Sequence, residues 1–174
     1  MAKLTILGVY HDDNHEDFPI VMDYVDKITV GSRVSLECSV TLEILLNLDE
    51  NDISQYESGT RFFNTIARKL NDKNIDINVV ENAELHSYQR LCLDQNEEVI
   101  TEIEHWFIYL SLLRSIEMYH QIIENGSTHA ILGAQHTYDI AAIGFETDIH
   151  YTSFRTDLIF PTEVFLEDLK KKIC

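Results

Sequence analysis

The chain has 174 residues, of which 45% are hydrophobic, enough for one α/β domain with a sizeable core. Its formal net charge of −17 at pH 7 argues against a protein that binds nucleic acid or an anionic membrane, since both ligands need a basic surface. No stretch approaches the roughly 18–20 apolar residues that span a bilayer, and the three scattered cysteines fit neither a disulfide framework nor a zinc motif. The first residues enter a strand-like segment without the apolar leader of a secreted protein, so we expect a cytoplasmic protein.

The first half of the chain alternates strand-like and helix-like segments. Residues 3–9 are rich in β-formers and predict a first strand, and residues 18–27 have one apolar face and predict a helix. Asp17 precedes this helix as a candidate N-cap, and Pro19 suits its first turn. The segments that follow are predicted as a strand at 32–37, helices at 41–56 and 58–74, and a strand at 75–80.

The second half begins with the strongest helical pattern in the chain. Residues 84–125 are predicted to be helical, most clearly from about Asn96, with Gly126 as the C-cap. The remaining segments are predicted as a strand at 129–133, a short helix from Thr137 to about Ile143, a short edge strand at 146–152 and a final helix at 162–172.

This alternation of strands and helices predicts parallel pairing. We therefore expect a three-layer α/β sandwich in which helices flank a mainly parallel or mixed central sheet. We expect residues 1–174 to form a single domain, because no linker or low-complexity tract interrupts them. Ligands of such sheets bind beyond the carboxyl ends of the strands, so the candidate site residues are those that directly follow predicted strands.

Two predicted strands lead into the same motif. The pattern I-L-G-x-x-H occurs twice and ends in His11 and His136, which lie 125 residues apart. The glycine is expected to let the chain turn off the strand or let the backbone approach a ligand closely. If these strands are parallel neighbours, both imidazoles reach one edge of the sheet, where Glu37 and Glu81 follow the second and third strands.

Two histidines with one or two carboxylates are a common set of ligands for a divalent metal ion. Imidazole suits zinc, iron or cobalt, and added carboxylate and water admit manganese. The predicted cofactor is therefore a divalent ion, with His11, His136 and Glu37 as its ligands.

Each of these side chains also has an ordinary interpretation. A single histidine is often a surface or hydrogen-bonded residue, Glu37 is able to cap a helix or form a salt bridge, and Glu81 is able to begin the next helix. Arg114 lies on the apolar stripe of the long helix, where a guanidinium needs a partner. It either holds a carboxylate ligand, grips an anionic oxygen in a transition state, or snorkels at the margin of the stripe.

Further candidates lie next to the two histidine motifs. The polar stretch HDDNHED completes a metal sphere, binds substrate, or forms a solvated loop that caps the next helix. Two tyrosines near the motifs either offer a hydroxyl to a reacting oxygen or serve packing. These further candidates are Tyr10, Asp12, Asp13, His15, Glu16 and Tyr138.

The same segments resemble a known family. In order and approximate spacing they are similar to motifs of the TraB/Tiki family, which is related to erythromycin-esterase-like and haem-uptake (ChaN-like) proteins. The matching segments are GVYH at 8–11, SLE at 35–37, RSIEM at 114–118 and GAQH at 133–136, so the resemblance spans roughly residues 3–144.

The resemblance implies a mixed-sheet α/β fold and, for the Tiki branch, metal-dependent peptide hydrolysis. It places His11, His136 and Glu37 in the active centre, with Arg114 as a supporting polar residue. Two positions depart from the family pattern. Tyr10 stands before the first histidine, where members usually carry a small or apolar residue, and a serine follows Arg114 in place of asparagine or aspartate.

These observations lead to the hypothesis of a metal-dependent hydrolase acting on peptide, ester or amide bonds of a peptide or small-molecule substrate. Besides Glu37, the expected catalytic side chains are Glu81 or Asp12, which would take a proton from water, and Arg114 or Tyr138, which would stabilise an oxyanion. One alternative is a non-catalytic module that binds a metal, haem or a small ligand. Another is a regulatory or scaffold protein that forms a homodimer through its long helix, which carries the single tryptophan.

Overall fold

The structure is a computed structural model that describes residues 4–49, 58–93, 100–143 and 147–151. Within these ranges the strands form one sheet in the order β3-β2-β4-β1-β5, and every neighbouring pair is parallel. The strands are β1 (Thr5–Val9), β2 (Arg33–Glu37), β3 (Asp76–Val80), β4 (His129–Gly133) and β5 (Asp148–Tyr151).

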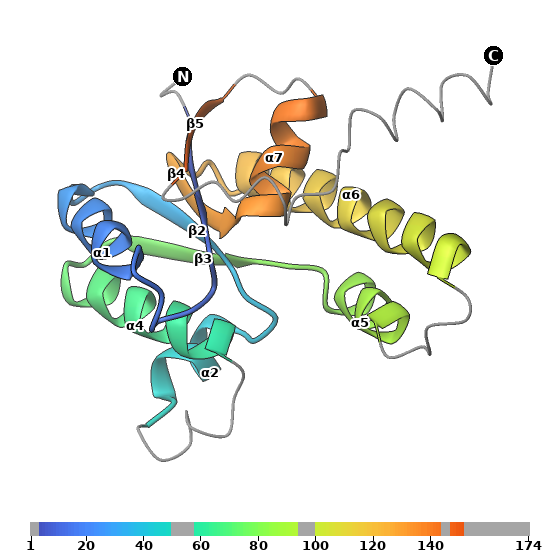
Figure 1. Cartoon of the computed structure of the whole chain (residues 1–174). Coiled ribbons are helices and arrows are strands. Elements are labelled where there is room, and N and C mark those ends of the chain that lie inside the picture. The colour runs from blue at the N-terminus through green and yellow to red at the C-terminus, as the bar shows by residue number, and fades with distance from the viewer. Residues whose placement is uncertain (1–3, 50–57, 94–99, 144–146, 152–174) are drawn as a thin grey trace.

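Helices cover both faces of this sheet (Figure 1). Helices α1 (Phe18–Lys27), α2 (Leu42–Asn47) and α4 (Ser58–Asp72) lie on one face. Helices α6 (Ile100–Glu124) and α7 (Ala134–Ile143) lie on the other, and α5 (Ala83–Leu93) packs against α6. The predicted three-layer α/β sandwich is confirmed, and its sheet is entirely parallel.

Two apolar clusters hold the layers together. Leu36 of β2 packs with Phe62 of α4 in the first cluster, and Leu132 of β4 packs with Met118 of α6 in the second. Neighbouring strand residues point to opposite faces, so Leu36 faces the first cluster while the adjacent Glu37 faces the layer of α6 and α7. The sheet thereby presents a carboxylate to the second helical layer.

The chain leaves β1 and β4 in opposite directions, although these strands are neighbours. Val9 of β1 is the register partner of Gly133 in β4. Beyond these residues, the chain from β1 enters α1 on one face, whereas the chain from β4 enters α7 on the other (Figure 1). Such a divergence opens a crevice at the carboxyl ends of two adjacent strands, which is where parallel α/β sheets bind ligands.

The helix after β4 begins earlier than predicted. Helix α7 starts at Ala134, immediately after the strand, rather than at Thr137. The hydroxyl of Thr137, in this first part of the helix, donates a hydrogen bond to the Gly133 carbonyl oxygen at 3.0 Å. His136 therefore lies within the first turn of a helix, not in a loop.

Other boundaries also differ from prediction. Helix α2 ends at Asn47 because Leu48 adopts an extended conformation that buries its side chain, and residues 50–57 lie outside the described ranges. Asp17 precedes α1 as expected, but its side chain makes no capping hydrogen bond. The predicted helix at 84–125 is divided into α5 and α6, and residues 94–99 between them, like the predicted helix at 162–172, are not described.

The buried face of α6 is partly polar. Ser111, Ser115, Met118 and Ile122 face inward, whereas Trp106, predicted on the apolar stripe, is 60% exposed. None of the described helices is both long and apolar enough to cross a bilayer.

Two adjacent isoleucines of α6 test which face of this helix is packed. Ile122 is fully buried in the second cluster, whereas its neighbour Ile123 is half-exposed. We expect Ile122→Ala to lower the free energy of unfolding by about 2–5 kcal/mol, because it leaves a cavity. The control Ile123→Ala is expected to change it by about 0.5 kcal/mol or less. Urea denaturation of both variants measures the difference, and equal losses would contradict the orientation of α6.

Candidate functional site

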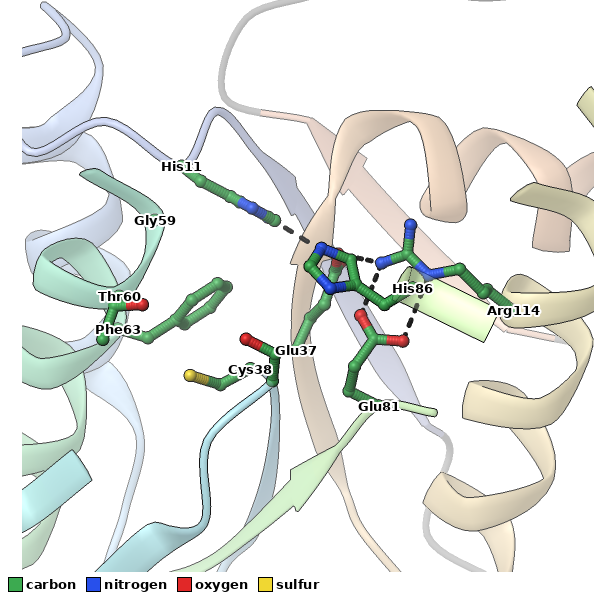
Figure 2. Close-up of a pocket in the computed structure, with 10 residues that line it drawn as sticks. His11, Glu37, Cys38, Gly59, Thr60, Phe63, Glu81, His86 and Arg114 are labelled. Atoms are coloured by element: carbon green, nitrogen blue, oxygen red, sulfur yellow. Dashed lines mark hydrogen bonds and ion pairs between the residues drawn. The ribbon is translucent and has the colours of Figure 1, made fainter. Parts of the chain in front are cut away.

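Polar side chains from neighbouring strands meet at the carboxyl edge of the sheet. The strand order brings together the residues that follow β3, β2, β4 and β1, which include Glu81, His136 and His11, with Glu37 at the end of β2 itself. Figure 2 shows His11 and Arg114 approaching Glu37 from opposite sides. The sequence motifs therefore do lead to one place in the fold.

Glu37 is the centre of this cluster. Its side chain is 7% exposed, and its Oε2 accepts a 2.7 Å hydrogen bond from the Gly133 backbone N–H. His11 Nε2 lies 3.7 Å from the same oxygen, and His136 Nε2 lies 3.4 Å from Oε1. The two predicted histidines thus flank the two oxygens of one carboxylate.

Arg114 is buried and holds two carboxylates rather than snorkelling to solvent. Its Nε and Nη2 donate to Glu81 Oε1 and Oε2 at 3.1 and 2.5 Å, and Nη2 also lies 3.4 Å from Glu37 Oε1. Its Nη1 donates to the side-chain oxygen of Gln89 on α5, a contact that no sequence motif indicated. Because both oxygens of Glu81 are bound by Arg114, the structure does not favour the predicted role of Glu81 as a proton acceptor.

His136 is buried and joined to a second polar group. Its Nδ1 lies 2.8 Å from the hydroxyl of Ser115, which in turn donates to Asp139 Oδ2 at 2.7 Å. Burial lowers the pKa of His136 and outweighs the opposing effect of the Glu37 carboxylate, so the imidazole is neutral at pH 7.

His11 presents a ring nitrogen that lacks a partner. Its Nε2 is buried and makes no hydrogen bond among the described residues. The ring packs edge-on against Phe63, with the ring centres 4.8 Å apart. A side chain at Gly133 would approach this ring closely, since a Cβ there would lie 3.0 Å from His11 Nε2. Glycine at position 133 therefore allows a close approach to the backbone, which was one of its two predicted roles. The group that approaches is the His11 side chain rather than a ligand.

Two cavities meet at His11 and Glu37. The larger, of about 310 Å³, is lined by both of these residues together with Tyr10, Gly133 and His136. The smaller, of about 70 Å³, is more polar and lies on the side of Arg114 (Figure 2). Its other lining residues include Cys38, Thr60, Phe63, Glu81 and His86. The sequence analysis did not single out His86, because it lies in a helix and belongs to no motif.

Acidic groups outnumber basic ones in this buried region. Glu37 and Glu81 share the guanidinium of Arg114, and the nearby carboxylate of Asp139 accepts hydrogen bonds from Ser111 and Ser115. Burial raises the pKa of Glu37, but nearby His136, His11 and Arg114 and the Gly133 N–H lower it to about 2. Glu37 is therefore ionised at neutral pH.

Two nitrogen–oxygen distances in this cluster are comparable with those between neighbouring ligands of one metal ion. In a tetrahedral site with bonds of about 2.1 Å, neighbouring ligand atoms lie about 3.4 Å apart. The contacts of Glu37 with His136 and His11, at 3.4 and 3.7 Å, come near this value. In the described part of the chain, no group of three or more His, Cys, Asp or Glu side chains stands ready to hold a metal ion.

The remaining candidates lie away from this centre. In the loop after β1, Asp12 accepts a hydrogen bond from the Asn14 backbone, and Asp13 pairs with Arg61 at 3.7 Å. His15 accepts from the Asp17 backbone N–H, and Glu16 is exposed. Among the tyrosines, Tyr10 lines the larger cavity, whereas Tyr138 is half-buried on α7 and lines neither cavity.

Comparison of the chain with known proteins finds no match among family models, curated proteins or solved structures. The resemblance to the TraB/Tiki family therefore rests on the four short motifs.

The pH dependence of stability tests the burial of Glu37. Its pKa is about 2 in the folded state and 4.5 ordinarily, so it stabilises the fold above pH 4.5, and this stabilisation is lost as the pH falls toward 2. We expect Glu37→Gln to make the free energy of unfolding less dependent on pH in this window. The control is Glu43→Gln, at an exposed position of α2. Urea denaturation at several pH values measures both slopes, and an unchanged slope in Glu37→Gln would refute the assigned environment.

The contact between Gly133 and His11 is testable in the same way. We expect Gly133→Ala to destabilise the protein by about 1–3 kcal/mol, because the new methyl group must displace His11 or Glu37. Gly59→Ala is the matched control, since a Cβ there would meet His11 Cβ at an ordinary 3.4 Å. Chemical denaturation of the two variants provides the comparison, and the expectation fails if Gly133→Ala is as stable as the wild type.

Proposed function

We propose that this chain is a metal-dependent hydrolase whose divalent ion would be held by His11, His136 and Glu37. The observation that carries the proposal is the placement of two imidazole Nε2 atoms beside the two oxygens of one ionised, buried carboxylate. One of these nitrogens, on His11, is buried without a hydrogen-bond partner among the described residues. Buried nitrogen lone pairs around a carboxylate form a set of donors for zinc, cobalt or manganese.

The charge of the site supports the same conclusion. The excess of buried carboxylates over guanidinium groups disfavours the empty site and favours a dication. Arg114 pairs with both Glu37 and Glu81 and holds the two carboxylates in position. The motifs that resemble the TraB/Tiki family are the segments that supply His11, Glu37, Arg114 and His136.

An ion at this position would supply Lewis acidity, polarising a substrate carbonyl and lowering the pKa of water in the site. The larger cavity, with a volume of about 310 Å³, suits a small substrate or a short stretch of peptide. The smaller polar cavity has room for water beside His11 and Glu37. Since Arg114 binds Glu81, the proposal assigns the acceptance of a proton to His86, which lines the smaller cavity.

The unpartnered nitrogen of His11 also supports a second candidate, a hydrolase that needs no ion. In this arrangement His11 Nε2 takes the proton of an attacking water, and Glu37 at 3.7 Å stabilises the resulting imidazolium. Both candidates use the same two residues, but only the first requires His136 as a ligand and loses activity with a chelator.

Zinc binding by variants tests the first candidate. We expect the wild type to bind one zinc ion by isothermal titration calorimetry. His11→Ala and His136→Ala should each weaken binding beyond the about 10–100-fold loss typical of an outer-shell partner. His150→Ala, at an exposed position of β5, is the matched control and should bind as the wild type does. The same proteins are then assayed with a panel of fluorogenic peptides, esters and amides, with and without chelator.

The outcomes separate the candidates. Turnover that chelator abolishes supports the metal-dependent enzyme, and chelator-resistant turnover that His11→Ala abolishes supports the ion-free one. Zinc binding without turnover of any substrate indicates a binding module. If the wild type binds no zinc and His11→Ala changes no measured activity, both hydrolase candidates are wrong.

A further inference from the structure

A hydrogen-bonded cluster lies behind His136, on the side away from Glu37. Its other members are Ser111 and Ser115 of α6 and Asp139 of α7, and each of these side chains is at most 2% exposed. The serines are four residues apart on one helix, and His136 and Asp139 are three apart on the other, so each pair shares a face. The chemistry proposed above uses none of these three residues.

The partners of the Ser115 hydroxyl decide where hydrogen atoms lie. Its Oγ is 2.7 Å from Asp139 Oδ2, 2.8 Å from the Ser111 carbonyl oxygen and 2.8 Å from His136 Nδ1. The hydroxyl has a single hydrogen, and an ionised carboxylate and a carbonyl oxygen only accept. Asp139 also accepts from the Gln135 amide at 2.8 Å and from the Ser111 hydroxyl at 3.2 Å, so donors surround both of its oxygens.

Two assignments of the hydrogens are possible, and they differ in cost. If Ser115 donated to His136, its lone pairs would face the Asp139 carboxylate and the Ser111 carbonyl at hydrogen-bond distance, with no hydrogen between them. If Ser115 donates to Asp139, the carboxylate receives the hydrogen of the hydroxyl. The Ser115 oxygen then accepts a hydrogen bond from the imidazole N–H. The second assignment leaves fewer acceptors facing each other.

We propose that Ser115, backed by Asp139, holds His136 as the tautomer that carries its hydrogen on Nδ1. The Nε2 lone pair then points into the site, 3.4 Å from Glu37 Oε1. Two acceptors at this distance repel each other unless a cation or a hydrogen lies between them. Ser115 and Asp139 are thus positioning residues, which act through His136 and do not touch the substrate.

The value of this tautomer rests on the proposed function. A neutral histidine binds a metal ion through the nitrogen that carries no hydrogen, and its other N–H is typically held by an outer hydrogen-bond acceptor that fixes the ring. The serine hydroxyl plays this part here and connects the ring to the buried carboxylate of Asp139.

The tautomer is measurable without any metal or substrate. NMR of the imidazole nitrogens distinguishes the protonated from the unprotonated ring nitrogen, and the His136 signals are assigned by their absence in His136→Gln. We expect the wild type to carry the hydrogen on Nδ1. In Ser115→Ala we expect it to move predominantly to Nε2, where it can be donated to Glu37. Ser115→Thr, which keeps a hydroxyl, should restore the wild-type signals.

Ser35→Ala is the matched control. Ser35 is fully buried like Ser115 and stands two residues before Glu37 in β2, but its hydroxyl pairs with Ser127 at 2.8 Å and belongs to a different hydrogen-bonded pair. This variant should leave the His136 signals unchanged. A hydrogen on Nε2 in the wild type overturns the inference, and so does an unchanged tautomer in a folded Ser115→Ala protein.

Zinc affinity separates this inference from the proposed function. We expect Ser115→Ala to weaken zinc binding about 10–100-fold and Ser35→Ala to leave it unchanged. Equal affinity of Ser115→Ala and the wild type would refute the positioning role. If the wild type binds no zinc, the proposed function fails, whereas the NMR assignment still decides the tautomer.

Discussion

The buried carboxylate of Glu37 is the interaction on which the rest of the site depends. A charge out of water is costly unless it is paired and hydrogen-bonded. Here the compensation comes from separate elements, through the Gly133 N–H of β4, Arg114 of α6 and the imidazoles that follow β1 and β4. One side chain at the end of β2 therefore interacts with groups that come from two further strands and a helix.

The topology of the sheet explains why distant motifs converge here. Because β1 and β4 are neighbours whose following helices lie on opposite faces, their carboxyl ends flank a crevice between α1 and α7. His11 and His136 occupy the two sides of this crevice, and the adjacent strand β2 supplies the carboxylate. The layers on either side are anchored by their own apolar clusters, so the polar residues between them do not have to provide the cohesion of the fold.

The sequence was most informative where a pattern reflects a local rule. The strands and the repeated histidine motif follow from β-rich runs that end in the same way, and the parallel sheet follows from their alternation with helices. The need of Arg114 for a partner was visible because a charge interrupts an apolar stripe. The identity of its partners was not, since Glu81 and Gln89 come from segments whose approach to α6 depends on the whole topology.

Where prediction failed, tertiary contacts had replaced local preferences. The apolar pattern after Leu42 indicated a longer helix, but burial of Leu48 in an extended conformation ends α2 early. Helix α7 was expected to begin beyond His136, because a glycine suggested a turn there. In the structure Gly133 completes the strand and provides clearance for the ring of His11 instead. Ser115 was visible in the sequence only as a departure from the family pattern, and the packing of α6 on α7 is what shows that it contacts His136.

The polar groups on the two sides of His136 differ, and in the proposed tautomer this difference determines which ring nitrogen carries the hydrogen. On one side, Asp139 and the Ser111 carbonyl are acceptors beside the Ser115 hydroxyl. In the proposed tautomer, the oxygen of this hydroxyl accepts a hydrogen bond from His136 Nδ1–H. On the other side, Glu37 faces Nε2 with no hydrogen bond between them, and His11 Nε2 approaches the same carboxylate without a partner in the described residues. A protein that needed only a stable core would gain from replacing these groups with apolar side chains of similar size. Their presence in a buried crevice, with His136 Nε2 and His11 Nε2 beside one carboxylate, is what the proposed cation site requires.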